Sequence, residues 1–208
     1  TLKRVVYGQD KAIESLAAVG PAYALDVSHM GFASGLLEAA GLPADTQEKL
    51  LTFIRQKNAH ELGQLLAEER VPAFYAERIG ALGTLSGAFP DTLARAEALC
   101  VSADMEAAVA ELRDLYAVLS AVGLSGSVQL DFSMLNDQSY YNGVVFQGYV
   151  EGAPRVVLSG GRYDPLMRRF GKAGDAIGFA MYLDELDRVL ADARAYDADV
   201  LALYREGD

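Results

Sequence analysis

Two short stretches in the second half of the chain carry residues that could bind a small molecule. The first, YYNGVVFQGY, begins with Tyr140 and Tyr141, and the second, SGGRYDPLMRRFG, contains Gly160, Gly161 and Tyr163. A tyrosine offers a hydroxyl that donates and accepts hydrogen bonds and a ring that forms an apolar wall. Neighbouring glycines let the backbone approach a bound molecule closely. Together the two stretches indicate a pocket for a small polar ligand.

Other polar residues have more ordinary explanations. We expect Arg162 and Asp164 to pair with each other or to cap the loop that contains them. Asp131 alternates with apolar residues and could either pair with a buried arginine or face the pocket. His29 follows a strand-like segment, so we interpret it as a turn residue and not as a catalytic base. His60 is expected to be an exposed helix residue near a cap.

Composition excludes several classes of function. The 29 acidic residues outnumber the 18 basic ones and give a net charge of −11, which argues against broad nucleic-acid binding. With two histidines and the single cysteine Cys100, no metal site is predicted, and no internal disulfide is possible. One cysteine fits a reducing cytoplasm, and Cys100 itself is expected to be a buried, small apolar residue. No apolar run reaches the roughly 18 residues of a membrane span, so no membrane partner is expected.

The start of the chain indicates a fragment. It opens on Thr1 without an initiating methionine, and LKRVVYG is typical of the middle of a domain.

The elements that must position these residues follow from hydrophobic periodicity. A period of two predicts strands, and a period of 3.6 predicts helices. The strands are expected at 22–28, 127–133, 143–150, 154–160, 176–183 and 198–204, and helices at 9–20, 31–41 and 184–195. Between 43 and 122 we expect four or five helices and no strand. Strands joined by short turns predict an α+β fold, an antiparallel sheet with helices on one face. We therefore expect a core of residues 1–42 and 123–208, interrupted by a helical insertion at 43–122.

Several segments, taken in order, resemble a known family. YALDVSHMGF resembles a strand and turn of histidyl-tRNA synthetase-like domains, where a similar stretch ends in His-Val-Gly. YYNGVVFQ resembles their Tyr-Tyr-Thr-Gly-x-x-Phe-Glu segment, and GGRYDPL resembles their Gly-Gly-Arg-Tyr-Asp-Gly-Leu loop. AIGFAMYLDEL lies where class II synthetases have their third motif. The resemblance covers most of the chain and implies a class II synthetase-like sheet flanked by helices. The first motif, which makes the dimer interface, and the second are not visible.

The resemblance also implies a histidine pocket. In that family the two tyrosine-bearing segments line the amino-acid site. This role carries over to Tyr140 or Tyr141 and to Tyr163, with Gly160 and Gly161 allowing close approach.

Departures from the family pattern affect ATP binding. Asn136 and Glu185 stand where the family has arginines that hold the developing charge and the ATP phosphates. A carboxylate repels a triphosphate that a guanidinium attracts. Tyr182 and Pro165 stand where the family has glycines. We therefore expect no adenylation, no catalytic residue and no cofactor.

A histidine pocket without adenylation resembles the regulatory subunits of ATP phosphoribosyltransferase. These are synthetase paralogues that do not charge tRNA. The resemblance implies a short-form catalytic subunit as partner, histidine as ligand, and a homodimer within a larger hetero-oligomer. The alternatives are an active histidyl-tRNA synthetase and a paralogue that only binds an amino acid.

Overall fold

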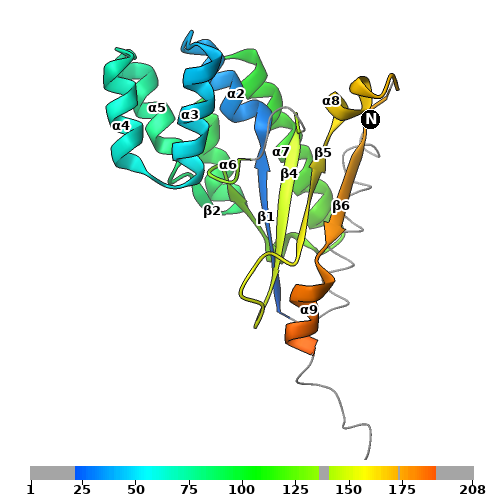
Figure 1. Cartoon of the computed structure of the whole chain (residues 1–208). Coiled ribbons are helices and arrows are strands. Elements are labelled where there is room, and N and C mark those ends of the chain that lie inside the picture. The colour runs from blue at the N-terminus through cyan, green and yellow to red at the C-terminus, as the bar shows by residue number, and fades with distance from the viewer. Residues whose placement is uncertain (1–21, 136–140, 173, 191–208) are drawn as a thin grey trace, which may run out of the picture.

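The computed structural model describes residues 22–135, 141–172 and 174–190 (Figure 1). Side chains are described as far as Asp187. The elements are, in chain order, β1 (Tyr23–His29), α2 (Met30–Ala39), α3 (Ala44–Arg55), α4 (Ala59–Glu68), α5 (Ala73–Leu82), β2 (Ser86–Ala88), α6 (Phe89–Glu97), α7 (Ala103–Ala121), the short 3-10 helix η1 (Ser125–Ser127), β3 (Val128–Asp131), β4 (Val144–Val150), β5 (Leu158–Arg162), α8 (Asp164–Arg169), β6 (Ile177–Met181) and α9 (Leu183–Leu190). The expected helix at 9–20 and strand at 198–204 lie outside the described residues.

The described strands form one sheet in the order β2-β3-β1-β4-β5-β6. Its pairs are antiparallel except for β1 and β3, which run parallel with Leu25 opposite Val128 and Val27 opposite Leu130. The prediction of a wholly antiparallel sheet was wrong at this pair. The parallel pairing arises because a run of helices connects β1 to β3. A long crossover of this kind lets the chain return to the end of the sheet where β1 begins, so that β3 runs in the same direction.

The helical segment also contains a strand that the sequence did not predict. β2 has three residues, Ser86–Ala88, and pairs with β3 through Gly87 opposite Leu130. Three residues are too few to establish a period of two. Otherwise the segment has five helices, α3 to α7, as expected. The division into a core and an insertion remains a proposal.

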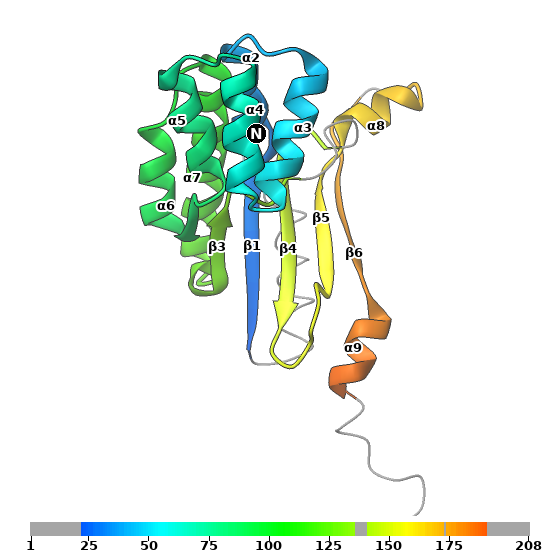
Figure 2. The same cartoon turned by 60° about the vertical axis from the view of Figure 1, so that its left-hand side comes forward.

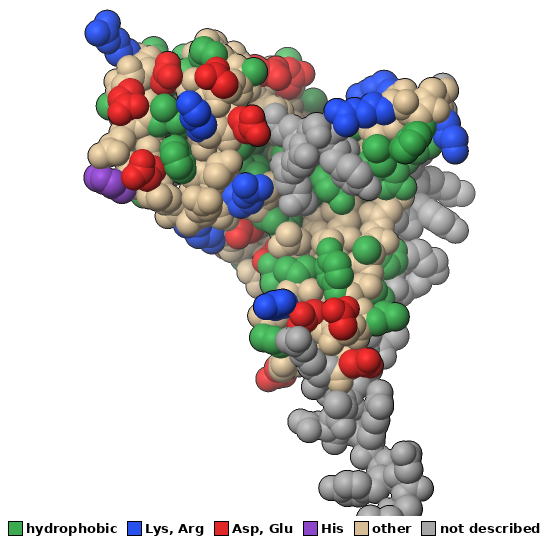
Figure 3. All heavy atoms as spheres, viewed as in Figure 1, with side chains coloured by type: hydrophobic (Ala, Val, Ile, Leu, Met, Phe, Trp, Pro, Cys, Tyr) green, Lys and Arg blue, Asp and Glu red, His purple; other side chains and the backbone are tan. Residues whose placement is uncertain are grey.

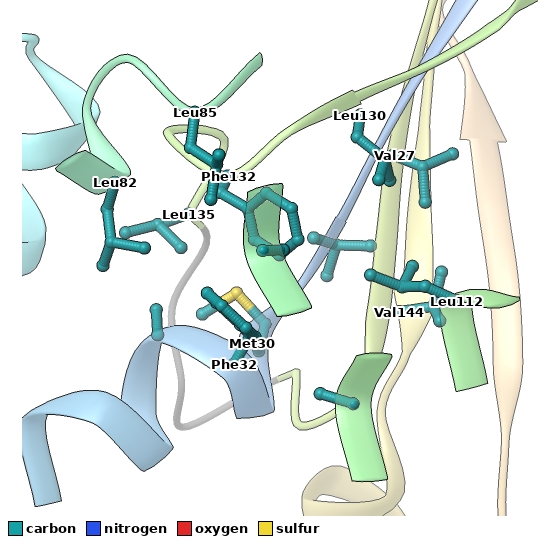
Figure 4. Packing of buried hydrophobic residues seen from close by; sticks show 14 of the residues in the cluster. Val27, Met30, Phe32, Leu82, Leu85, Leu112, Leu130, Phe132, Leu135 and Val144 are labelled. Atoms are coloured by element: carbon teal, nitrogen blue, oxygen red, sulfur yellow. The ribbon is translucent and has the colours of Figure 1, made fainter. Parts of the chain in front are cut away.

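Helices α2 to α7 lie on one side of the sheet, whereas β5, β6, α8 and α9 extend away from them (Figures 1 and 2). One sheet face is apolar and packs against α2 and α7, and there Val27, Leu130 and Val144 belong to the same buried cluster as Leu112 of α7 (Figure 4). Phe32 of α2 contacts Phe132, with 4.6 Å between ring centroids. Each fully buried side chain of this size contributes about 1.5–3 kcal/mol. This packing fixes the sheet on which the candidate site lies.

Helix ends follow from local chemistry. The Oγ of Ser102 accepts a hydrogen bond from the backbone N–H of Met105 and caps the long helix α7. The Asn58 side chain caps α4 in the same way through the N–H of Glu61. None of the described helices is long and apolar enough to cross a membrane.

Candidate functional site

A cleft of about 1070 Å³ lies on the sheet face opposite the core. Because side chains alternate along a strand, Gln147 and Tyr149 of β4 and Ser159 of β5 point to this face, while Phe146 and Leu158 point to the core. Figure 3 shows hydrophobic side chains gathered on this face beside α9, bordered by acidic and basic ones. The cleft is lined by Tyr141, Gln147, Tyr149, Pro154, Arg155, Val156, Ser159, Tyr182, Asp184 and Glu185.

Two tyrosine rings lie against glycines of the sheet. A Cβ atom at Gly161 would stand 2.8 Å from Cδ1 of Tyr141 and 2.9 Å from the carbonyl oxygen of Val144. A Cβ at Gly178 of β6 would stand 3.2 Å from Cε1 of Tyr163. The glycines therefore let both rings lie directly on the backbone. Sequence reasoning missed Gly178, although it lies in the segment that resembles the third motif.

The other predicted site residues are placed differently. A Cβ at Gly160 would stand 2.7 Å from Cζ of Phe146, so Gly160 makes room for a core ring on the opposite side of the strand. Tyr140 and Asn136 lie outside the described residues. Tyr141 lines the cleft, and Tyr163 lies against β6. The role of these residues in binding histidine remains a prediction.

The end of the cleft near α9 carries a different set of groups. The hydroxyl of Tyr182 is 2.8 Å from Oγ of Ser159. Glu185 is buried, and its Oε1 lies 3.6 Å from Nη1 of Arg155. Asp184 adds a second carboxylate to this end. These carboxylates would repel an anionic ligand. The guanidinium of Arg155, which could attract such a ligand, is already paired with Glu185.

The loop after β5 is held by a buried carboxylate. Asp164 is 2% exposed and accepts hydrogen bonds from Nε of Arg162 at 2.6 Å, from the N–H of Ala176 at 2.9 Å and from Nδ2 of Asn142 at 3.2 Å. Burial alone would raise the pKa of Asp164, but these hydrogen bonds and the charge of Arg162 hold it below its ordinary value. The predicted Arg162–Asp164 pair is thus confirmed.

Arg162 also joins the loop to helix α7. Its Nη1 lies 3.5 Å from Oε1 of Glu111, whose Oε2 is 3.1 Å from Nε2 of His29. The hydrogen bond with His29 is the main reason that the pKa of Glu111 lies below its ordinary value, and the charges of His29 and Arg162 also lower it. Sequence reasoning missed Glu111.

Neither of the two histidines lines the cleft. His29 ends β1, where a turn into α2 was expected, and it is buried away from the residues that line the cleft. His60 is an exposed residue of α4, as predicted, and lies 3.1 Å from the side chain of Gln64.

Asp131 and Cys100 also have clear positions. Oδ1 of Asp131 accepts hydrogen bonds from the N–H and Oγ of Ser133, and Oδ2 lies 3.6 Å from Nζ of Lys57. The cation beside Asp131 is therefore a lysine and not a buried arginine. Asp131 also lines a smaller hollow beside the main cleft. Cys100 is only partly buried, so the prediction of a buried cysteine was wrong.

The chain is similar to known proteins in sequence and in fold. The family model described as "Histidyl-tRNA synthetase" matches residues 9–186. The chain belongs to the histidyl-tRNA synthetase family. Within that family, it is 32% identical over 200 residues to the ATP phosphoribosyltransferase regulatory subunit of Acetivibrio thermocellus, which covers 94% of this chain and 48% of the relative. The chain thus spans about half the length of that relative.

Solved structures show the same fold. An ATP phosphoribosyltransferase regulatory subunit/histidyl-tRNA synthetase from Bacillus halodurans superposes with a TM-score of 0.76 at 28% identity, over 86% of this chain and 46% of that one. The ATP phosphoribosyl transferase (HisG:HisZ) complex from Thermotoga maritima contains a chain with a TM-score of 0.59 at 19% identity, which covers 83% of this chain and 60% of its own length. The expected class II synthetase-like fold, an α+β sheet flanked by helices, is confirmed.

Proposed function

We propose that the chain is part of a non-catalytic regulatory subunit of ATP phosphoribosyltransferase, which serves the first step of histidine biosynthesis and its feedback control by histidine. The name of the Acetivibrio thermocellus relative supports this proposal. The partner would be the short-form catalytic subunit of ATP phosphoribosyltransferase. The assembly would be a homodimer within a larger hetero-oligomer. The Thermotoga protein, which shares the fold, was solved as a complex. A cytoplasmic location fits the single cysteine.

The distribution of groups along the cleft is the observation that carries the proposal. Tyr141 offers a ring and a hydroxyl at one part of the cleft, while Tyr182 and the carboxylates of Asp184 and Glu185 lie at the α9 end. Carboxylates repel phosphate groups, and the Tyr182 side chain fills space where the family has a glycine. Such a cleft favours an amino acid over an amino acid together with ATP. Sensing of histidine requires a site for the amino acid and no site for ATP.

Reconstitution tests the proposal. The full-length protein is mixed with a short-form ATP phosphoribosyltransferase, and turnover is measured with and without histidine. We expect a complex with higher turnover that histidine inhibits. Tyr163→Phe removes one hydroxyl and should raise the histidine concentration needed for half-inhibition by about tenfold, the value of one good hydrogen bond to a ligand. No complex, together with unchanged turnover and histidine response, would refute the proposal.

The family description supports a second candidate, an active histidyl-tRNA synthetase. Histidine-dependent exchange of pyrophosphate into ATP by the full-length protein would decide for it. A third candidate, a paralogue that binds another amino acid, is separated from both by calorimetry with a panel of amino acids.

A further inference from the structure

The segment that follows β5 presents basic side chains and an aromatic ring to solvent. Its helix α8 extends away from the sheet (Figure 2). Arg168 and Arg169 at the end of α8 and Lys172 just beyond it are exposed, and Phe170 between them is 70% exposed. Figure 3 shows basic side chains gathered over α8. These four residues, Arg168, Arg169, Phe170 and Lys172, are called the α8 tip below.

The cations of the α8 tip pair with no carboxylate in the part of the chain that the structure describes. The two carboxylates that flank the segment are both directed to Arg162. Oδ2 of Asp164 lies 2.6 Å from its Nε, and Oδ1 of Asp175 lies 3.6 Å from its Nη2. The sequence has no acidic residue from 165 to 174. An otherwise acidic chain therefore keeps a small basic surface at the end of α8.

The backbone holds the α8 tip in a defined shape. The N–H of Lys172 donates to the carbonyl oxygen of Met167 at 3.0 Å, and the N–H of Gly171 donates to that of Arg168 at 3.0 Å. Gly171 has a φ of 68°, the left-handed conformation that this type of helix ending requires. At its other end, α8 begins at the buried Asp164. A surface that is ordered before binding loses little conformational entropy when a partner docks.

The residue types of the α8 tip fit a protein partner with an acidic surface. Aromatic and arginine side chains are enriched in protein interfaces and dominate their binding energy. Phe170 would fill an apolar pocket of the partner, and carboxylates around that pocket would pair with the three cations. A nucleic acid would instead bring a row of phosphates against a chain with a net charge of −11, which three cations would neutralise only locally. The charge of the chain thus favours a protein partner.

We infer that the α8 tip is a docking surface for the catalytic subunit of the proposed complex. The part of that subunit that it contacts presents carboxylates around an apolar pocket, which receives Phe170. This inference rests on the proposed function and names the surface through which the two proteins meet. Because most of the chain is acidic and would repel such a surface, the α8 tip also determines the orientation in which the partner approaches.

The test measures the affinity of the full-length protein for a short-form ATP phosphoribosyltransferase. The double substitution Arg168→Glu and Arg169→Glu should weaken the complex by about tenfold or more at low ionic strength, mainly through slower association, and added salt should reduce the difference. The matched control is the double substitution Lys49→Glu and Arg55→Glu at exposed positions of α3. It changes the net charge equally and should leave the affinity within about threefold of the parent, because only long-range charge is altered.

Phe170→Ser tests the apolar contact separately from the charges. We expect the complex to weaken by about tenfold or more through faster dissociation, with little dependence on salt. Val122→Ser is the matched control, because Val122 is 56% exposed at the end of α7, and it should leave the affinity unchanged. All of these side chains are exposed, so the melting temperature of each variant should equal that of the parent.

The outcomes separate this inference from the proposed function. If the parent forms the complex and both α8-tip variants bind as tightly as the parent, the inference is overturned and the regulatory function stands. If the parent forms no complex, the inference falls together with the proposed function. Weaker binding that comes with a lower melting temperature in both variants would assign the α8 tip to the fold and overturn the inference. An unchanged complex, with binding of a short single-stranded RNA that the charge-reversal variant loses, would overturn it in favour of a nucleic-acid partner.

Discussion

The guanidinium of Arg162 donates a hydrogen bond from Nε to the buried carboxylate of Asp164, with 2.6 Å between the two atoms. The residue between them, Tyr163, has its ring against Gly178 on the other side of the sheet. Arg162 extends the link to Glu111 of α7 and through it to His29. The ion pair on the core side thus fixes the backbone from which Tyr163, a predicted histidine-binding residue, projects.

Replacement of Asp164 by Asn should destabilise the protein by about 1–3 kcal/mol, because Arg162 and the backbone N–H of Ala176 lose a charged acceptor. The folded state lowers the pKa of Asp164, so its stabilising contribution is present above the unfolded value of about 3.9 and is lost as the pH falls through the lower folded value. Urea denaturation at a series of pH values from neutral downwards measures this. In the Asn variant the loss of stability at acid pH should be smaller than in the parent. Equal acid sensitivity of both would contradict the assignment.

Substitution of Glu111 by Gln tests the link between α7 and the loop. We expect a loss of about 1 kcal/mol or less, because the side chain is partly exposed and solvent screens its charge. The pKa of Glu111 is lowered in the fold, so this contribution too is present above its unfolded pKa and disappears as the pH falls. Glu77→Gln removes an equivalent charge from an exposed position on α5 and serves as the control. Thermal denaturation of both variants compares them, and equal effects would show that Glu111 has no specific role.

Ser28 offers a prediction of the opposite sign. Its hydroxyl is fully buried and has no hydrogen-bond partner within the described residues. A buried hydroxyl without a partner costs free energy, so Ser28→Ala should leave the protein equally stable or stabilise it by about 1 kcal/mol. Chemical denaturation measures the change. A marked loss of stability would mean that the hydroxyl contributes to the fold.

The sequence predicted those parts of the fold that depend on local periodicity. Leu25 and Val27 alternate with polar residues, and Leu112 and Leu115 share a helix face, and both patterns appear in the core. The parallel pairing of Leu25 with Val128 depends on how the crossover folds, which no local pattern encodes. β2 escaped prediction because its residues, Ser86–Ala88, are held by the backbone of β3 and not by their own propensity.

The candidate site divides in the same way. The motifs indicated Tyr140, Tyr141, Gly160, Gly161 and Tyr163, because these residues belong to two short contiguous stretches, and of these Tyr141 lines the cleft. His29 and Glu111 are 82 positions apart, and each alone is an ordinary polar residue. Gly160 shows the remaining difficulty: adjacent glycines face opposite sides of a strand, so one borders the site and the other the core.

Gly161→Ala should damage the site more than the fold at large. The added methyl would stand 2.8 Å from the ring of Tyr141 and 2.9 Å from the carbonyl oxygen of Val144, so the ring must move. Overpacking of this kind costs about 1–3 kcal/mol, and the displaced Tyr141 should reduce histidine affinity at least tenfold in calorimetry of the full-length protein. Gly63→Ala is the matched control: Gly63 lies at an exposed position of helix α4, with nothing within 4 Å of the added atom. That change should stabilise the protein by about 0.5–1 kcal/mol and leave histidine binding unchanged, because alanine favours the helix. Unaltered histidine binding in the Gly161 variant, measured under conditions where it is folded, would show that Tyr141 is not part of the binding site.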